Sequence, residues 1–245
     1  QSEAIKAIEG ESAILSAPTG SGKTWVAYLW AGLMDVNTEP IMPSRRVIFT
    51  APIKALSNER YLDLKSMGFD VGIETGDFKK NANAMVLCCT QEIYTLKYAS
   101  VPNQKVIIDE FHFIFNDSER ARAYIDGLRS TSFHSDVLVM SATFGNPEVV
   151  KKYLEKMGMR EFVLYKTDSR ATELVFRKKG LRFGQIHDAL VFVFSKKGGE
   201  WIASQIAATR QKISRANLLR LREIADILEV ARIHETMLRG VGLYF

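Results

Sequence analysis

The sequence predicts an α/β fold built on a mainly parallel sheet with helices on both faces. Three observations carry that prediction. Short apolar, β-branched runs alternate with longer segments of helical periodicity. Polar or acidic residues directly follow several of these runs, as they do at the carboxyl ends of buried parallel strands. The first apolar run leads through a glycine-bearing loop into a helical segment.

The expected elements follow from the positions of these runs. Strands are expected near residues 13–17, 47–51, 71–74, 85–90, 105–109, 137–141 and 162–165. Helices are expected near residues 23–34, 54–66, 91–98, 117–129 and 147–156. A Lys/Arg/Gly-rich stretch then indicates a linker at about 166–185. Residues 1–165 are therefore expected to form one domain and residues 186–245 to begin another.

The loop after the first strand has the composition of a phosphate-binding loop. It reads A-P-T-G-S-G-K-T over residues 17–24. Small residues let backbone N–H groups close around phosphate oxygens, and the helix N-terminus adds a positive dipole end. In this pattern Lys23 reaches the β- and γ-phosphates and the Thr24 hydroxyl holds Mg²⁺. A chance Gly/Ser turn is the alternative, but the flanking strand and helix favour a nucleoside triphosphate site. The residues expected to contact the nucleotide here are Thr19, Gly20, Ser21, Gly22, Lys23 and Thr24.

An acidic motif, Asp109-Glu110-Phe111-His112, follows the apolar run 106–108. A carboxylate at the tip of a buried strand beside a phosphate loop can hold the water shell of Mg²⁺, which is the role expected of Asp109. Glu110 can orient and activate the attacking water, and His112 can couple the site to neighbouring segments. Alone, the motif is compatible with a solvated acidic surface; its position after an apolar strand favours a metal site.

The segment Ser141-Ala142-Thr143 follows the next apolar strand, so three motifs appear in order. A plain strand-to-loop turn would explain that tripeptide equally well if it stood alone. The chain resembles the ATPase lobe, plus part of the second lobe, of DExH-box helicases of superfamily two, in particular the Ski-type RNA helicases that work with RNA-degrading machinery. Like them, it has alanine, Ala17, where the general phosphate loop begins with glycine. Further segments that carry the resemblance are 51–59, 75–77, 90–93 and 109–120.

The resemblance implies a RecA-like P-loop NTPase lobe followed by an incomplete second RecA-like lobe. It implies an ATP-dependent helicase that hydrolyses Mg-ATP to move along one strand, 3′ to 5′, with RNA preferred over DNA. Lys23, Asp109 and Glu110 are then the catalytic residues. Gln1 resembles the glutamine with which this family contacts adenine. The residues that would couple hydrolysis to lobe movement are His112, Ser141 and Thr143.

Single-stranded nucleic acid is expected at loops beyond the strand ends. Backbone N–H groups, lysines and hydroxyls at such loops can hold a sugar-phosphate backbone without reading its sequence. The residues expected there are Pro52, Lys54, Gly76, Thr90, Gln91, Ser195 and Lys196. For Lys54 a solvated helix lysine is the alternative. Ser195 and Lys196 resemble the tip of the first strand of the second lobe, at 189–195, and a helix would follow at 201–208. Residues 213–239 are expected to form one or two amphipathic helices packed on a core.

Charge is distributed unevenly along the chain, whose net charge is +5. Residues 1–164 hold 18 basic against 20 acidic residues, a balance of −2, and residues 165–245 hold 15 against 8, a balance of +7. A basic excess fits a phosphate-backbone partner, although a solvated helix face is the stronger interpretation for residues 210–222. No apolar run reaches the length of a bilayer span and no secretory signal is visible. Together with cysteines that resemble reduced core residues, this leads us to expect an intracellular compartment, cytoplasmic or nuclear. Cys88 and Cys89 are expected to be reduced core residues.

The family's last motifs, a Thr/Asp loop and a Q-x-x-G-R-x-G-R helix that supplies an arginine finger, have no match in this sequence. We therefore expect a piece of a longer helicase that binds nucleotide but hydrolyses it weakly or not at all. An RNA-processing or RNA-degrading complex is the expected partner. Three alternatives stay open: a DNA repair helicase, a nucleic-acid-binding module clamped by ATP without unwinding, and a phosphotransferase with its own acceptor site.

Overall fold

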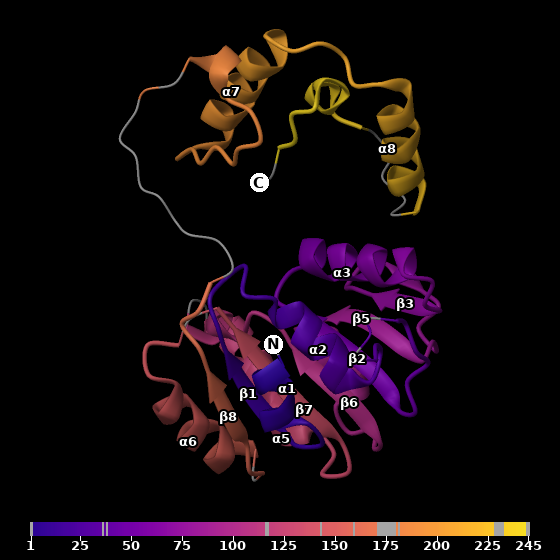
Figure 1. Ribbon diagram of the computed structural model, residues 1–245, viewed down its shortest axis with the longest axis vertical. Helices are drawn as coiled ribbons and strands as arrows, with labels where there is room; N and C mark the ends of the chain where they lie inside the picture. Colours follow the sequence, from indigo (N-terminus) through magenta and orange to yellow (C-terminus); the bar gives the residue numbers. More distant parts are fainter. Residues whose placement is uncertain are drawn as a thin grey trace. The chain divides into compact units, whose positions relative to one another are not determined.

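A computed structural model gives the arrangement of the chain (Figure 1). It describes residues 2–35, 37, 39–115, 118–142, 144–158, 160–170, 180, 182–227 and 233–243. These fall into two compact units, residues 1–173 and residues 174–245, and each is treated by itself below. Gln1 and Thr143, two of the predicted site residues, lie outside the described residues.

The first unit is built on an eight-stranded sheet with the order β4-β3-β5-β2-β6-β7-β1-β8 (Figure 1). Neighbouring strands run parallel, except that β4 pairs antiparallel with β3. The strands are β1 (Ala13–Ser16), β2 (Arg46–Ala51), β3 (Val71–Glu74), β4 (Lys79–Lys80), β5 (Val86–Thr90), β6 (Gln104–Ile108), β7 (Asp136–Ser141) and β8 (Val163–Lys166). The seven predicted strands are thus confirmed. Strand β4 was not predicted, because two exposed lysines have no apolar pattern.

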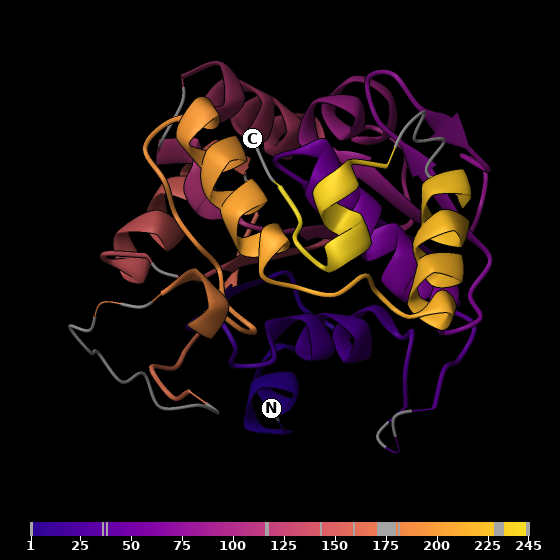
Figure 2. The same cartoon turned by 90° about the horizontal axis from the view of Figure 1, so that it is seen from above.

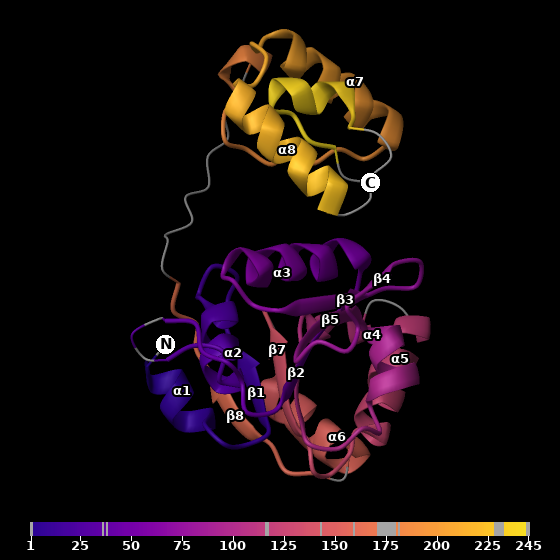
Figure 3. The same cartoon turned by 90° about the vertical axis from the view of Figure 1, so that its right-hand side faces the viewer.

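Helices cover both faces of this sheet. In Figure 3, α1 and α2 lie on one side of the strands, and α5 and α6 lie on the other. The helical elements of the unit are α1 (Ser2–Ile8), α2 (Lys23–Ala31), α3 (Lys54–Ser66), α4 (Gln91–Ile93), the π-helix η1 (Tyr94–Tyr98), the 3₁₀-helix η2 (Phe111–Phe115), α5 (Ser118–Ser130) and α6 (Pro147–Gly158). The helices predicted at 54–66, 117–129 and 147–156 are confirmed within two residues.

Helix α2 is shorter than the predicted 23–34. It ends at Ala31 because Gly32 adopts a left-handed conformation, with φ of 74°, and its N–H donates to the carbonyl oxygens of Tyr28 and Leu29. A glycine in this conformation satisfies the last carbonyl groups of a helix at no steric cost.

The core explains the apolar runs. Residues of β1 and β5 are buried at every position, because helices cover the sheet on both sides. Between the sheet and helices α5 and α6, strand side chains such as Ile14 and Val139 share one cluster with Phe111, Tyr124 and Leu128. Phe111 stacks edge-on against Tyr124, with ring centroids 5.4 Å apart. The acidic motif thus begins where a strand leaves this core.

Gly72 on β3 allows a close approach that no other residue would permit. A Cβ atom there would lie 2.0 Å from the backbone oxygen of Asn81. We expect Gly72→Ala to lower the free energy of unfolding by about 1–3 kcal/mol, because backbone rather than a flexible side chain must move. Denaturant unfolding would measure this. Gly145→Ala is the matched control, since a Cβ at Gly145 meets no atom within 4 Å. Equal midpoints for the two variants would contradict the expectation.

The regular elements that the structure describes in the second unit are all helical. Its elements are the 3₁₀-helix η3 (Phe183–Gln185), α7 (Lys196–Ala208), α8 (Arg215–Ile227) and the 3₁₀-helix η4 (Glu235–Arg239). Figure 2 shows η4 beside α7, and the rings of Phe183 and Trp201 meet edge-on with centroids 5.8 Å apart. The helix predicted at 201–208 lies within α7, and α8 lies within the predicted helical region.

The strand predicted at 189–195 is wrong for this structure. Residues 189–193 have no regular secondary structure, and Phe192 and Phe194 are 90% and 111% exposed. A strand needs a hydrogen-bonded neighbour, and the described residues of the second unit supply none. The apolar stripe of α8 also departs from its interpretation as core, since Ala225 is the buried residue of that helix and Leu219 is 58% exposed.

The helices offer no membrane span. Among the described residues, none of them combines the length and the apolar character that crossing a bilayer requires.

Candidate nucleotide and nucleic-acid site

The sheet brings the three predicted motifs to neighbouring strand ends. Strand β7 lies between β1 and β6, so Ser141 at its end aligns with Ser16, just before the phosphate loop. Strand β6 ends at Ile108, and Asp109 follows it. Because parallel strands end at one edge of a sheet, the loop, the acidic pair and Ser141 lie along the same edge.

The phosphate loop is held in a turn by its glycines and by Lys23. Gly20 and Gly22 have φ of 79° and 86°, which side chains disfavour, and Gly22 caps the start of α2. Lys23 Nζ donates to the carbonyl oxygens of Ala17 and Pro18, at 2.8 and 3.1 Å. Lys23 therefore fixes the loop against the start of α2, where free backbone N–H groups of a helix N-terminus can bind an anion.

Two observations test whether these residues fit a nucleotide. Ser21 Oγ is buried without a hydrogen-bond partner among the described residues, as expected of a group that awaits a phosphate oxygen. Burial lowers the pKa of the Lys23 ammonium, while the carboxylates of Glu110 and Asp109 act in the opposite direction. A half-buried cation that faces two carboxylates is suited to a Mg²⁺-bound polyphosphate, so the residues fit the nucleotide.

A cavity of about 280 Å³ adjoins Lys23. It lies between α1, the phosphate loop and the segment that follows β8, and Tyr165, Thr167 and Arg170 line it together with Leu15. The sequence predicts residues 165–170 as the end of a strand and the start of a linker, and no motif marks them as site residues. Their position beside Lys23 makes this cavity the candidate place for the rest of a nucleotide.

The predicted metal ligands are a hydroxyl and a carboxylate, oxygen donors of the kind that Mg²⁺ prefers. Asp109 Oδ1 accepts from the backbone N–H of Glu110 at 2.8 Å, which orients the carboxylate. Arg60 of α3 contacts both groups. Its Nη2 lies 3.2 Å from Thr24 Oγ1 and 3.6 Å from Asp109 Oδ2. Sequence reasoning missed Arg60, because an arginine in a polar helix carries no motif of its own.

Glu110 occupies an unusual backbone position, with φ of 49°. Strain of this kind at a non-glycine residue is often found at functional sites. Burial and the neighbouring Asp109 carboxylate raise the pKa of Glu110, while His112 and Lys23 act in the opposite direction. Its Oε2 is buried and makes no hydrogen bond with the described residues, although it lies 3.2 Å from His112 Nδ1. Such a carboxylate can accept a proton from a water molecule.

His112 also reaches the third motif. Its Nδ1 lies 3.4 Å from Ser141 Oγ and 3.2 Å from Glu110 Oε2. The histidine therefore lies between Glu110 and Ser141 at the end of β7. Ser141 is fully buried, so a movement of His112 at this contact would shift a residue inside the sheet.

The predicted nucleic-acid residues of the first unit lie at the ends of β2, β3 and β5. Lys54 begins α3, and its Nζ lies 2.7 Å from Asp77 Oδ2, just after Gly76. Both side chains are more than half exposed, so this edge is open to solvent. The carbonyl of Pro52 accepts from Arg120 at 3.2 Å, which ties the loop to α5. Lys54 and Gly76 thus come together at one exposed edge.

Two predicted contacts lie deeper. Gln91 is fully buried: its Oε1 accepts from the Thr50 hydroxyl at 2.6 Å, and its Nε2 donates to Thr95. Its side chain is therefore part of the core, and Thr90 before it is only 6% exposed. At this loop, backbone groups remain the candidates for contact with a single nucleic-acid strand. In the second unit, Ser195 caps α7, accepting from the Gly198 N–H at 3.1 Å, and Lys196 is the first residue of that helix.

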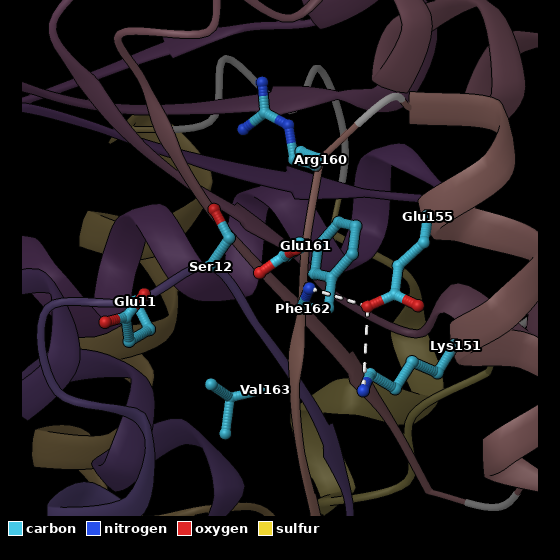
Figure 4. Close-up of a pocket in the computed structure, with 8 residues that line it drawn as sticks. All are labelled: Glu11, Ser12, Lys151, Glu155, Arg160, Glu161, Phe162 and Val163. Carbon is cyan, nitrogen blue, oxygen red and sulfur yellow. Dashed lines mark hydrogen bonds and ion pairs between the residues drawn. The ribbon is translucent and has the colours of Figure 1, made fainter.

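A second cavity, of about 610 Å³, opens at the opposite end of β1 and β8 (Figure 4). Glu155 lies on its wall and accepts from the Phe162 N–H at 3.1 Å, while Lys151 pairs with the same carboxylate oxygen at 3.6 Å. Ligands of open α/β sheets bind beyond the carboxyl ends of the strands. This cavity lies beyond the amino ends and contains none of the predicted site residues.

Comparison with known proteins identifies the family. The sequence pattern of the DEAD/DEAH box helicases matches residues 1–152, more than half of the chain. The chain belongs to the DEAD/DEAH box helicase family. The fold predicted for the first unit, a RecA-like lobe with a mainly parallel sheet, is confirmed together with this membership.

Curated helicases of this family are similar in sequence. The chain is 36% identical over 181 residues to the DExH-box ATP-dependent RNA helicase DExH9 of Arabidopsis thaliana, covering 71% of the chain and 18% of that protein. It is 31% identical over 180 residues to Superkiller complex protein 2 of Mus musculus, covering 71% of the chain and 14% of that protein. The predicted resemblance to Ski-type helicases is thus confirmed, and the chain spans less than a fifth of the length of these relatives.

A solved helicase shares the fold. The structure of the DUF1998 helicase MrfA bound to DNA and AMPPNP matches 91% of the chain and 39% of that protein, with a TM-score of 0.59 and 17% identity. At this identity the likeness concerns architecture alone.

Proposed function

We propose that this helicase-family chain is the ATP-binding part of an ATP-dependent RNA helicase. The observation that carries the proposal is the electrostatic effect of the Asp109 and Glu110 carboxylates, which follow β6, on the half-buried Lys23, which follows the loop after β1. Beside it, Ser21 Oγ and Glu110 Oε2 are buried and lack hydrogen-bond partners among the described residues. A chance glycine turn or a solvated acidic surface would not bring a half-buried lysine within the field of two carboxylates.

Each residue has a defined task in this proposal. The N–H groups of the phosphate loop and Lys23 bind and orient the β- and γ-phosphates. Thr24 and Asp109 would hold Mg²⁺, which when bound neutralises charge on the phosphate oxygens. Glu110 Oε2 accepts a proton from the attacking water, since its pKa is raised by burial and by Asp109. His112 transmits the change in charge at Glu110 to Ser141, because its Nδ1 contacts both side chains.

RNA is the proposed nucleic acid, because DExH9, the relative at 36% identity, is named as an RNA helicase. Movement from 3′ to 5′ and translocation driven by Mg-ATP belong to the same proposal. A role in an RNA-degrading assembly is supported by the similarity to Superkiller complex protein 2, whose name makes it a component of a complex. An intracellular compartment follows from such a substrate.

ATP binding and hydrolysis, measured without nucleic acid, with single-stranded RNA and with single-stranded DNA, test the proposal. We expect ATP to bind and its hydrolysis to stay slow, with RNA stimulating the slow hydrolysis more than DNA does, and Lys23→Ala serves as the blank. Hydrolysis stimulated by DNA alone would overturn the RNA assignment. ATP-dependent RNA binding by the chain, with neither hydrolysis nor unwinding, would favour a clamp, and failure to bind ATP would refute the proposal as a whole.

Lys54 and Asp77 give a sharper test of the nucleic-acid edge. We expect Lys54→Ala to weaken single-stranded RNA binding for all sequences and to reduce the salt slope of log K by about 0.7, because one phosphate contact is lost. Asp77→Asn should strengthen binding, because it frees Lys54 from the ion pair at 2.7 Å. Fluorescence anisotropy across a salt series would measure both. The control is Lys152→Ala, on an exposed face of α6. The same loss in Lys54→Ala and the control would refute the assignment.

A further inference from the structure

Arg60 joins helix α3 to the candidate metal site. Its Nη2 donates to Thr24 Oγ1 at 3.2 Å, and the same nitrogen lies 3.6 Å from Asp109 Oδ2. These are the two oxygens that would hold Mg²⁺ in the proposed function. The guanidinium side chain is 20% exposed, and the Asp109 carboxylate 21% exposed, so water screens this contact only partly.

The other side of the guanidinium is anchored away from the site. Nη1 donates to the Tyr28 hydroxyl at 2.9 Å and lies 3.4 Å from Asp63 Oδ2. Tyr28 in turn donates to the same Asp63 oxygen, and the guanidinium lies over the rings of Tyr28 and Phe49. Arg60 therefore has two anionic partners on opposite sides, Asp109 at the site and Asp63 on its own helix.

A guanidinium and a divalent cation compete when they draw on the same oxygens. Arg60 donates to the Thr24 oxygen and pairs with the Asp109 carboxylate, so it engages oxygen lone pairs that a metal ion would also use, and its positive charge repels an ion held there. We propose that Arg60 is a positioning residue that sets the affinity of the nucleotide site for Mg²⁺, because it competes with the ion for Thr24 and Asp109. Asp63 is the counter-anion that attracts the Arg60 guanidinium away from Asp109. The inference rests on the proposed function, because it takes the nucleotide-binding role of Lys23 and Thr24 as given.

The competition predicts shifts of opposite sign in two variants. Arg60→Gln removes the competing cation and should lower the Mg²⁺ concentration that gives half-maximal binding of a fluorescent ATP analogue, by about tenfold. Asp63→Asn removes the counter-anion and should raise that concentration, because Arg60 then pairs with Asp109 alone. Arg60→Lys keeps the charge and should stay close to wild type. A purely structural role of Arg60 would move Arg60→Gln and Asp63→Asn in the same direction.

The measurement is a Mg²⁺ titration of analogue binding, which needs no turnover. Arg46→Gln is the matched control. Arg46 is also partly buried, and its guanidinium carbon lies 5.0 Å from the ring centroid of Tyr98. It is the first residue of β2, so it lies at the amino ends of the parallel strands, whereas the candidate site lies at their carboxyl ends. Circular dichroism checks that each variant is folded. If Arg60→Gln does not fold, Asp63→Asn decides.

The outcomes separate the two proposals. Lowered and raised midpoints in Arg60→Gln and Asp63→Asn, with Arg46→Gln unchanged, support the competition. An unchanged or raised midpoint in Arg60→Gln, or an unchanged one in Asp63→Asn, overturns it while the wild type still binds ATP. Absence of analogue binding by the wild type at every Mg²⁺ concentration overturns the proposed function and this inference together.

Discussion

Lys23→Ala is expected to weaken ATP binding by at least about a hundredfold, because it removes two charge-assisted hydrogen bonds to phosphate, each worth roughly 1.5–3 kcal/mol. Lys23 is the first residue of α2 and projects back into its own loop, where Nζ contacts the carbonyls of Ala17 and Pro18. The same geometry leaves the ammonium within reach of anything held at the loop. Equilibrium titration with a fluorescent ATP analogue measures the loss.

Lys105→Ala is the matched control for this variant. Lys105 is also a partly buried lysine whose pKa is lowered by burial, and its Nζ donates to a backbone carbonyl, that of Trp30, at 2.6 Å. It lies near the amino end of β6, away from the carboxyl strand ends. We expect Lys105→Ala to lower stability and leave ATP affinity unchanged. Equal affinities for wild type and Lys23→Ala would remove the basis of the nucleotide site.

The elements that the sequence predicts well are those whose signal is local. A strand buried on both faces is a continuous apolar run, and the loop and acidic motif each follow such a run directly. Parallel pairing then brings Asp109 and Ser141 to one edge without further information. For this reason the sequence alone predicts the fold of the first unit and the residues at the centre of its candidate site.

The features that could not be predicted depend on partners distant in the chain. Arg60 and Gln91 are polar residues of helices, a type that is usually solvated. Arg60 nevertheless contacts Tyr28 and Asp109, and Gln91 is buried and hydrogen-bonded to Thr50. Nothing in its own segment distinguishes Arg60 from a surface residue, and the strand end before Gln91 predicts a nucleic-acid contact rather than burial. The left-handed backbone of Glu110 is likewise invisible, since glutamate rarely adopts it. In the second unit, the apolar run 189–195 satisfies the strand pattern, but the part of that unit that the structure describes contains no strand for it to pair with.

Glu110→Gln is expected to slow hydrolysis by about 10²–10⁴-fold, the usual contribution of a general base, while ATP still binds. Glutamine keeps the shape and the polar contacts of the side chain but cannot take a proton from water. Single-turnover measurements with the chain in excess over labelled ATP can resolve even the slow hydrolysis expected here. The exposed Glu9→Gln serves as the control. A rate unchanged in Glu110→Gln would show that another group accepts the proton.

The same variant should also be more stable than wild type at neutral pH, in a way that depends on pH. Burial and Asp109 raise the folded-state pKa of Glu110, so the folded chain holds that proton more tightly than the unfolded chain does. As pH rises from the unfolded pKa, about 4.3, through the folded pKa, wild type loses stability because the carboxylate must ionise where it is poorly solvated. Glutamine does not titrate, so the gain appears across this window, is complete above it and vanishes in acid. Unfolding midpoints of wild type and Glu110→Gln, measured across that pH range, test this expectation. If Glu110→Gln were more stable than wild type only in acid, desolvation of the Glu110 carboxylate would be excluded as the cause.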